Sequence, residues 1–318
     1  MRVAVLGTGG VATRHLGVLR ALDDVEVVAH LSAVPERARA QAARWGGRPY
    51  SDLIELLDRE RPQAVWICLT PDRHGEPEET LIERGIPFLV EKPLSNDLAT
   101  ADRIAAHLVE RPLITAVGYK LRALDTLPRV RDLLAERPVR LILASWHDVT
   151  PSAAWWRDPE RSGGQVVEQA THLVDLARVL IGEGELLCGA IAAPSADMGM
   201  AQVSAALLRF GEVPAALTAT CVLEARHTVQ LQLVCDGEVL TQTEHALRVE
   251  AAQARAEYPV LTDPFLVEDD AFLRAVRSGD PHQVLCSYSD ALRTHRLCCD
   301  IQRRATWTTD PVAPASPT

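Results

Sequence analysis

The sequence lacks several features that would place the chain in a specialised class of protein. No apolar run approaches the roughly 18 residues that a membrane-spanning helix needs. The first apolar stretch, in MRVAVLGTGG, ends in glycines and not in a signal-peptide cleavage site. Basic residues form no block, and the formal net charge of -10 disfavours nucleic acid and anionic lipid as partners. We therefore expect a protein that binds neither nucleic acid nor a membrane.

Cysteine usage indicates neither a disulfide framework nor a metal centre. The seven cysteines are odd in number, irregular in spacing and free of any CxxC pair. Most stand inside apolar runs, where a thiol behaves as a small hydrophobic group. These observations favour unpaired structural thiols, no metal, and a reducing, cytoplasmic setting.

The chain does contain enough apolar sequence for two domains. Its 318 residues are 47% hydrophobic, and at roughly 150 residues per domain this length fits two. Apolar strand-like runs at 2–6, 25–31, 64–69, 87–90 and 113–117 alternate with helical stretches at 11–22, 35–44, 76–84 and 97–107. This alternation is typical of a parallel sheet covered on both faces. It predicts a doubly wound Rossmann domain over residues 1–120.

Beyond residue 120 strand-like runs follow one another with few helices between them. A helix at 124–134, a strand at 139–146, a loop at 148–164 and an amphipathic helix at 169–181 come first. Runs at 203–210, 215–222, 229–234 and 239–242, joined by short turns, predict a largely antiparallel sheet. Helices at 265–277 and 288–303 follow.

This pattern predicts an α+β domain over residues 121–309 and a frayed tail at 310–318, which contains three prolines. The apolar strand faces of this domain outnumber what one layer of helices covers. We therefore expect a homo-oligomer, a dimer or a tetramer, that assembles through this sheet.

A glycine-rich turn between the first strand and the first helix predicts a dinucleotide site. Gly7-Thr8-Gly9-Gly10-Val11-Ala12 matches the pattern GxGxxA. In this pattern Gly7 allows a tight turn, Gly9 lets the backbone approach a pyrophosphate, and Ala12 permits close packing of helix on strand. The N–H groups of the helix N-terminus would then face the phosphates.

The end of the second strand favours NADP over NAD. It reads His30-Leu31-Ser32 and carries no acid that would bind a ribose 2′-hydroxyl. Ser32 and Arg37 could instead accept a 2′-phosphate. The alternative for Arg37 is a solvated helix residue without a ligand.

Two later strands end in polar segments, at Thr70-Pro71 and at Glu91-Lys92-Pro93. The carboxyl ends of strands in an open α/β sheet form the ligand crevice. A lysine at this place could orient a hydroxyl or a carbonyl with its N–H donors. The alternative is that Lys92 pairs with Glu91 on the surface.

In the segment GGQVVEQATHLVD, Glu168, His172 and Asp175 fall at i, i+4 and i+7 if a helix begins near Gln165. This spacing puts them on one face. A carboxylate beside an imidazole fixes its tautomer and raises its basicity, which suits general acid–base catalysis. The alternative is a polar helix face with a hydrogen-bonded histidine. No further His or Cys stands at ligand spacing, so no metal site is predicted.

These segments, in this order, resemble the Gfo/Idh/MocA family of glucose–fructose oxidoreductase, myo-inositol dehydrogenase and their relatives. The resemblance rests on GTGGVA, TPDRH, EKP, GYKLR, WWR, the GG turn, EQATHLVD and the closing segments AFLRAVRSGD and SYSDALRTHRL. It covers essentially the whole chain. It implies a Rossmann domain followed by an α+β domain with an open, mostly antiparallel sheet, and NAD(P) as the cofactor.

The resemblance also implies roles for single residues. Lys92 would lie beside the nicotinamide and the substrate hydroxyl, and His172 would accept or donate the proton. Glu168 stands where many members carry Asp in the substrate site, and Asp175 would support the site. The residues implied near the cofactor or the substrate crevice are Thr70, Pro71, His74, Glu91, Tyr119, Arg122, Trp155 and Trp156. For the two tryptophans the alternative is simple packing.

The implied activity is hydride transfer between NAD(P) and a secondary alcohol or ketone of a sugar, polyol or sugar derivative. Lys92 would stabilise charge on the reacting oxygen, and His172 would move the proton. Two alternatives remain: a cofactor-recycling glycoside-cleaving enzyme of the same family, and a non-catalytic dinucleotide sensor. Intact Lys92 and His172 argue against the sensor.

Overall fold

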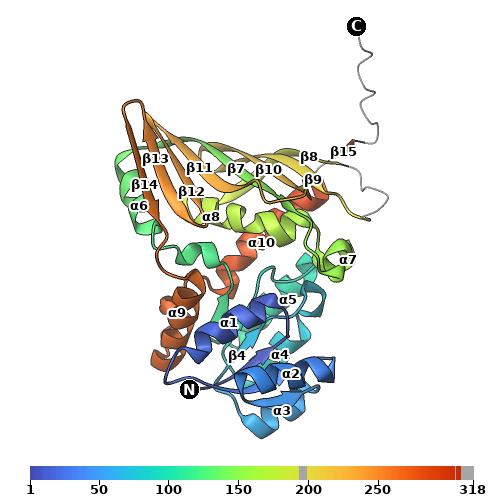
Figure 1. The fold of residues 1–318 in the computed structure, drawn as a ribbon. Coiled ribbons are helices and arrows are strands. Elements are labelled where there is room, and N and C mark those ends of the chain that lie inside the picture. Colours follow the sequence, from blue (N-terminus) through green and yellow to red (C-terminus); the bar gives the residue numbers. More distant parts are fainter. Residues whose placement is uncertain (193–198, 305, 309–318) are drawn as a thin grey trace.

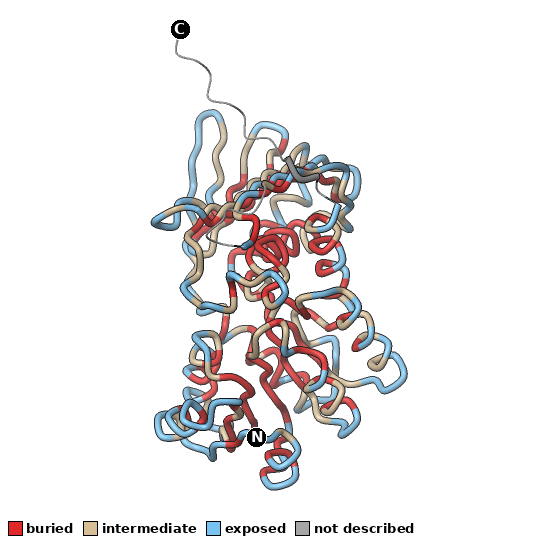
Figure 2. Tube along the Cα trace, turned by 90° about the vertical axis from the view of Figure 1, so that its right-hand side faces the viewer, coloured by how far each residue is buried: buried red, intermediate tan, exposed pale blue. Residues whose placement is uncertain are grey.

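A computed structural model describes residues 1–192, 199–304 and 306–308, so the predicted tail at 310–318 lies outside the described residues. Two sheets organise the described chain, and helices α8 (Thr171–Ile181) and α10 (Tyr288–Arg304) lie between the upper sheet and the lower part of the molecule in Figure 1. The buried trace runs through the centre of both parts, and exposed segments lie at their rims (Figure 2). No helix among the described residues combines the length and the apolar character needed to cross a membrane.

The first sheet has six parallel strands in the order β3-β2-β1-β4-β5-β6, which confirms the predicted doubly wound class. Its strands are β1 (Arg2–Leu6), β2 (Glu26–Leu31), β3 (Arg48–Tyr50), β4 (Ala64–Ile67), β5 (Phe88–Val90) and β6 (Thr115–Val117). The helical segments between them are α1 (Gly10–Arg20), α2 (Pro35–Trp45), α3 (Leu53–Glu60), η1 (Pro71–Arg73), α4 (Glu76–Arg84) and α5 (Leu98–Glu110). Strand order reverses beside β1, so the carboxyl ends of β1 and β4 open a crevice there.

Helices α3, α4 and α5 pack on one face of this sheet, where Leu56, Leu81 and Ile104 join its apolar side chains. The other face packs on α1 and on α9 (Pro264–Ser278), which contributes Phe272 and Leu273. Helix α9 follows the second sheet in the sequence, so the chain returns to complete the core of the first sheet.

The sequence prediction missed β3 and α3. Strand β3 is three residues long and contains Arg and Pro, so it shows no apolar alternation. Helix α3 begins at a conventional cap, because the Asp52 side chain accepts a hydrogen bond from the backbone N–H of Glu55 at 2.7 Å.

The second sheet has nine strands in the order β14-β13-β12-β11-β7-β10-β9-β8-β15. Only the β7–β10 and β8–β15 pairs are parallel, which confirms a mostly antiparallel sheet. Its strands are β7 (Val139–Val149), β8 (Gly184–Ala192), β9 (Val203–Phe210), β10 (Val213–Leu223), β11 (Thr228–Cys235), β12 (Glu238–Thr243), β13 (Ala246–Ala251), β14 (Ala254–Pro259) and β15 (Thr306–Thr308). The remaining helical segments are η2 (Lys120–Ala123), α6 (Leu127–Glu136), η3 (Ala154–Arg157), α7 (Pro159–Ser162), η4 (Val166–Ala170) and η5 (Pro281–Gln283).

Helix α8 corrects the prediction of an amphipathic helix. Every residue from Thr171 to Arg178 is buried, because α10 packs against the side of α8 that does not face the sheet. The preceding turn, η4, is a π-helix. Such turns occur frequently at functional sites, and this one carries Glu168.

The strands of the second sheet bury alternate residues against α8 and α10 and leave an opposite, open face. Val203, Leu207 and Val222 are exposed on β9 and β10, where residues of the other face are buried. We call this surface the open face of the second sheet. It is an exposed apolar surface of the kind that marks interaction sites.

Candidate active site

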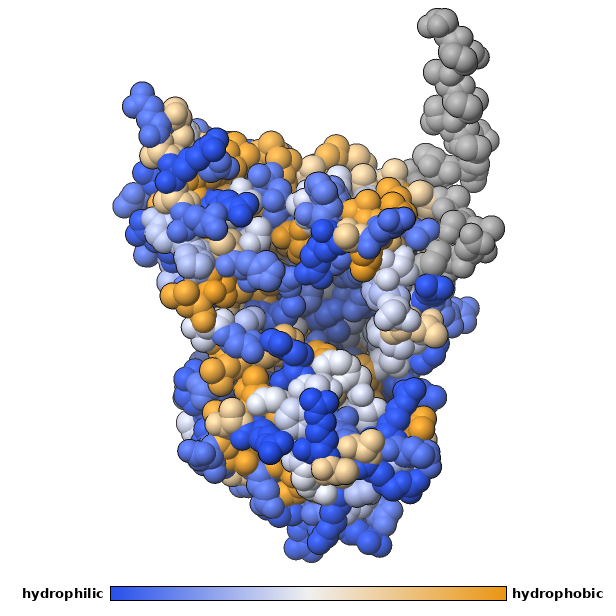
Figure 3. Space-filling model, viewed as in Figure 1, coloured by the Kyte–Doolittle hydropathy of each residue, from blue (hydrophilic) through white to orange (hydrophobic). Residues whose placement is uncertain are grey.

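A cavity of about 810 Å³ lies between the carboxyl ends of the parallel strands and the near end of the second sheet. In the space-filling view it corresponds to the hollow between the upper and lower parts (Figure 3). Fourteen predicted site residues line it: Gly7, Thr8, Gly9, Gly10, Val11, Ser32, Arg37, Thr70, Pro71, Glu91, Lys92, Trp155, Glu168 and His172. Segments that are distant in sequence therefore meet at one cavity.

The glycine turn has the geometry of a phosphate cradle. Gly7 has φ +105, and a Cβ there would lie 2.2 Å from the carbonyl oxygen of Cys68, so only glycine fits. Gly9 and Gly10 face open space, since a Cβ on either would meet nothing within 4 Å. No side chain caps the N-terminus of α1. Its first N–H groups thus point toward the cavity without a side-chain acceptor, which fits the diphosphate of a dinucleotide.

The far end of the cavity carries Ser32 and Arg37. Ser32 is buried and accepts a hydrogen bond from the backbone N–H of Val34 at 3.2 Å. The neighbouring His30 is tied to the backbone, because its Nε2 lies 2.8 Å from the carbonyl oxygen of Gly46. No acidic side chain lines this end of the cavity among the described residues.

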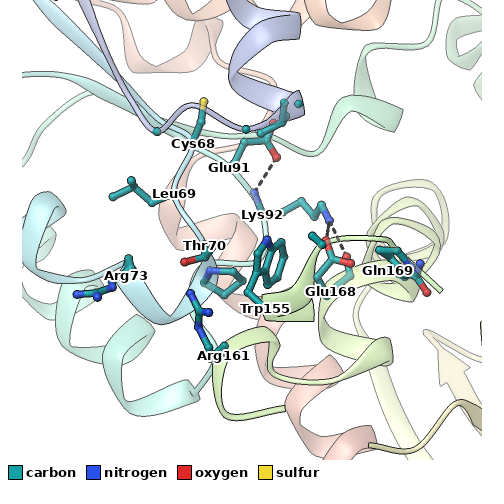
Figure 4. A pocket seen from close by; sticks show the side chains of 18 of the residues that line it. Cys68, Leu69, Thr70, Arg73, Glu91, Lys92, Trp155, Arg161, Glu168 and Gln169 are labelled. Atoms are coloured by element: carbon teal, nitrogen blue, oxygen red, sulfur yellow. Dashed lines mark hydrogen bonds and ion pairs between the residues drawn. The ribbon is translucent and has the colours of Figure 1, made fainter. Parts of the chain in front are cut away.

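Lys92 points away from Glu91 and into the cavity (Figure 4). Its Nζ donates to the carboxylate Oε1 of Glu168 at 2.7 Å and to the backbone oxygen of Glu168 at 2.6 Å. Only the backbone N–H of Lys92 reaches Glu91, at 3.1 Å. The alternative of a surface ion pair between Lys92 and Glu91 is therefore wrong. The second carboxylate oxygen of Glu168 accepts from Trp156 Nε1 at 2.6 Å.

His172 lies in an aromatic setting without a carboxylate partner. Its ring stacks on Trp146 with centroids 5.9 Å apart and meets the edge of Tyr119 at 5.9 Å. Burial, and then the charges of Lys92 and Lys120, hold the pKa of His172 well below its usual 6.5. The imidazole is thus neutral at neutral pH and can accept a proton. The expectation of a carboxylate that raises its basicity is wrong, since Glu168 binds Lys92 instead.

Asp175 and Arg122 belong to the protein interior. Arg122 donates to both carboxylate oxygens of Asp175, at 2.7 and 2.6 Å, and also pairs with Asp290 of α10. This network joins η2, α8 and α10. Asp175 does not contact His172; it faces Arg122 and Thr294 because the helix turns it toward α10.

Five predicted site residues do not line the cavity. They are Ala12, His74, Tyr119, Arg122 and Trp156. The Tyr119 hydroxyl bonds Thr171 Oγ1 at 2.9 Å, and His74 Nδ1 bonds the carbonyl oxygen of Leu94 at 3.2 Å. Both side chains are buried. Any effect of these side chains on a ligand would pass through the neighbours that they hold.

Besides Arg73 and Arg161, four charged residues of the cavity escaped the sequence prediction, and these four form one chain of ion pairs. Lys120 binds Glu244 at 2.7 Å, and Arg226 binds both Glu244, at 2.5 Å, and Asp148, at 2.8 Å. We call them the charged wall. One signal was available for Lys120: Lys92 and Lys120 are the only lysines in the sequence, and both line the cavity.

A parallel sheet with an open glycine turn at its switch point is typical of dinucleotide-binding proteins. Residues 1–119 match the oxidoreductase family with an NAD-binding Rossmann fold, GFO/IDH/MocA. Residues 137–241 match the GFO/IDH/MocA C-terminal domain. The chain belongs to this family, which confirms the resemblance found in its motifs.

Among curated relatives, the chain is 26% identical over 188 residues to myo-inositol 2-dehydrogenase of Thermotoga maritima, covering 58% of this chain and 55% of that one. It is 32% identical over 123 residues to 4-carboxy-2-hydroxymuconate-6-semialdehyde dehydrogenase of Sphingobium, covering 38% and 39%. The matches thus span little more than half, or less, of these relatives. In structure it is similar to KijD10, a 3-ketoreductase from Actinomadura kijaniata in complex with NADP and TDP-benzene, with TM-score 0.87, 24% identity and coverage of 98% and 99%.

Proposed function

We propose that this chain is an NAD(P)-dependent oxidoreductase that transfers a hydride between the nicotinamide and a secondary alcohol, or the matching ketone, of a sugar, polyol or sugar derivative. The observation that carries the proposal is the meeting of Lys92, Glu168 and a neutral His172 at the cavity onto which the glycine turn opens. A dinucleotide supplies the hydride acceptor or donor. The protein must then orient the substrate oxygen and move its proton.

Lys92 is arranged to hold the reacting oxygen. An ammonium group has three N–H donors, and two of those of Lys92 point to Glu168. The third is left for a ligand. In alcohol oxidation, charge builds on the substrate oxygen, and the fixed ammonium group stabilises it. His172, kept neutral by burial and by the nearby lysines, accepts the hydroxyl proton.

The charged wall supports a substrate rich in hydroxyl groups. Its two cations and two carboxylates are already paired at 2.5–2.8 Å. A hydroxyl group can donate to a carboxylate and accept from a cation without separating either pair. An anionic group placed at this wall would have to draw Lys120 or Arg226 away from Glu244.

We further propose a preference for NADP. Ser32 and Arg37 line the cavity end where an acid would serve NAD. The NADP in the KijD10 structure agrees with this proposal.

We also propose that the protein is a homo-oligomer, a dimer or a tetramer, through the open face of the second sheet. Exposed Val203, Leu207 and Val222 support this assembly. The mass in solution, measured by sedimentation, should exceed 34.8 kDa, and Leu207→Glu should reduce it. A monomer at all concentrations would contradict the assembly.

The function is tested with the purified protein in two steps. Fluorescence titration with NADPH and NADH measures cofactor binding, and absorbance of the nicotinamide then follows turnover on a panel of polyols, sugars and keto-sugars. Turnover with at least one neutral polyol or keto-sugar is expected. Tight cofactor binding with no turnover on the whole panel would favour a non-catalytic binder. Glycoside cleavage without net change in the nicotinamide would favour the cofactor-recycling reaction.

A further inference from the structure

A buried cluster of ionisable side chains adjoins the cavity and joins helix α1 to helix α9. His15 of α1 is completely buried between two carboxylates. Its Nδ1 lies 2.8 Å from Asp269 Oδ1 of α9, and its Nε2 lies 3.1 Å from Glu91 Oε1. Trp66 Nε1 donates to the same oxygen of Asp269 at 2.9 Å. None of these contacts is explained by the reaction proposed above.

The geometry favours two protons on the His15 ring. Each ring nitrogen faces a carboxylate oxygen, and only the charged imidazole donates at both positions. Burial opposes this charge, but Asp269 and Glu91 more than offset it and raise the pKa of His15 well above 6.5. The other groups that face this cluster are Glu268 of α9, the Cys68 thiol and Lys120 of η2.

Glu268 differs from its neighbour Asp269, because neither of its carboxylate oxygens has a hydrogen-bond partner although both are buried. Burial and the nearby Glu91 raise the pKa of Glu268 well above 4.5. We therefore treat Glu268 as protonated and neutral. One imidazolium then faces two carboxylates, Glu91 and Asp269.

The cluster reaches the cavity through Glu91. Glu91 Oε2 accepts the backbone N–H of Lys92 at 3.1 Å. The same carboxylate lies against Gly118, where an added Cβ would be 2.7 Å from it. Glu91 is thus clamped between His15, the Lys92 backbone and Gly118. The turn that carries Lys92 is held by this clamp.

We propose that His15, charged and held by Asp269, is a positioning residue: it fixes the Glu91 carboxylate and, through it, the turn that places Lys92 in the cavity. His15 does not line the cavity, so its effect passes through Glu91. The kinetic part of this inference rests on the proposed oxidoreductase function. The protonation and stability parts do not depend on it.

Two adjacent residues of α9 provide a matched test. Asp269→Asn and Glu268→Gln each replace a buried carboxyl group by its amide. Asp269→Asn removes the anion that holds His15 charged, so kcat should fall by about 10²-fold, as for a catalytic group displaced by about 1 Å. Glu268→Gln resembles the protonated carboxyl already present, so kcat and the Kd for NADPH should both stay within about twofold. Equal effects of the two variants would overturn the proposal.

Two measurements do not depend on turnover. NMR of ring-labelled histidine in the unmodified protein should show His15 doubly protonated at neutral pH, and Asp269→Asn should make it neutral. The stabilisation from His15 is complete below its unfolded pKa, near 6.5, and is lost as the pH rises through its raised folded value. The unfolding midpoint should therefore fall on the alkaline side, and His15→Gln should flatten this fall, whereas His282→Gln on the surface should not.

The outcomes separate this inference from the proposed function. A neutral His15 in the unmodified protein would overturn the inference, whether or not turnover is found. A stoichiometric divalent metal in the purified protein would also overturn it, because Nε2 of His15 and oxygens of Glu91 and Glu268 lie within 4.8 Å of one another and a cation there would replace the proton. A charged His15 in a protein without turnover on any substrate would leave the inference standing and refute the function.

Discussion

The contact between Lys92 and Glu168 gives the sharpest test of the candidate active site. In Glu168→Gln the introduced amide keeps one acceptor oxygen but replaces the other by an N–H donor. In the unmodified protein both carboxylate oxygens of Glu168 accept a hydrogen bond, one from Lys92 Nζ at 2.7 Å and the other from Trp156 Nε1 at 2.6 Å. One of these donors must therefore lose its partner. A hydrogen bond to a charged group contributes about 1.5–3 kcal/mol.

Solvent screening reduces this magnitude only slightly, because the Lys92 and Glu168 side chains are just 13% and 15% exposed. We expect the free energy of unfolding to fall by about 2 kcal/mol and the unfolding midpoint by about 3 °C. If Lys92 loses its position by about 1 Å, kcat should fall by about 10²-fold.

The two lysines of the chain allow an assay that needs no substrate. An amine-directed acylating reagent can modify only Lys92, Lys120 and the N-terminus, and mass spectrometry follows each separately. Glu168→Gln should speed the modification of Lys92 and leave Lys120 unchanged. The matched control is Glu244→Gln, which removes the corresponding acceptor from Lys120, bound at 2.7 Å, and should have the reverse effect. An unchanged rate at Lys92 together with an unchanged unfolding midpoint would refute the assigned role of Glu168.

Three further predictions concern other parts of the cavity. His172→Ala should lower turnover by about 10²–10⁴-fold without weakening cofactor binding in a fluorescence titration. Because the pKa of His172 lies well below 6.5, kcat/KM for alcohol oxidation should not decline until the pH falls below 6.5. A decline of kcat/KM that begins above pH 6.5 would contradict the assignment. Arg37→Ala should weaken NADPH binding by about tenfold, through loss of a charge-assisted contact with the 2′-phosphate, and leave NADH binding unchanged; equal losses for both would argue against an NADP site. Gly118→Ala should destabilise the protein by about 1–3 kcal/mol in denaturant unfolding, because its Cβ would lie 2.7 Å from the Glu91 side chain. As a control, Gly17→Ala in α1 should be neutral or stabilising, because an added Cβ there would meet nothing within 4 Å. A Gly118→Ala variant of unchanged stability would show that Glu91 is not clamped.

The parallel sheet and the glycine turn were predictable from sequence because both depend on local pattern. Buried parallel strands are continuous apolar runs, and a GxGxxA segment after the first of them leaves few alternatives. Gly7 illustrates this: its φ of +105 and the 2.2 Å approach to Cys68 are what the motif requires. Short elements such as β3 carry no such pattern and were missed.

Contacts between distant segments were not predictable in the same way. Helical spacing put Glu168, His172 and Asp175 on one face, but it could not say what that face meets. Lys92 lies 76 positions from Glu168, and Arg122 lies 53 from Asp175. Lys92 binds Glu168 and Arg122 binds Asp175, although helical spacing alone would have paired these carboxylates with His172. The return of α9 to the first sheet was hidden for the same reason, since its apolar positions show only that it is buried somewhere.

The distribution of basic residues connects sequence to function more directly. Of 33 basic side chains, arginine fills every position except two, and those two, Lys92 and Lys120, line the cavity. A guanidinium is a rigid planar fork that suits fixed ion pairs, as in the Arg122–Asp175 contact, and it stays charged. An ammonium group is compact and rotates three donors about one bond, so it can bind Glu168 and still turn a donor toward a substrate oxygen as its charge changes. Replacing Lys92 by Arg should therefore preserve the ion pair and lose turnover, which would separate the structural role of the charge from its role toward the substrate.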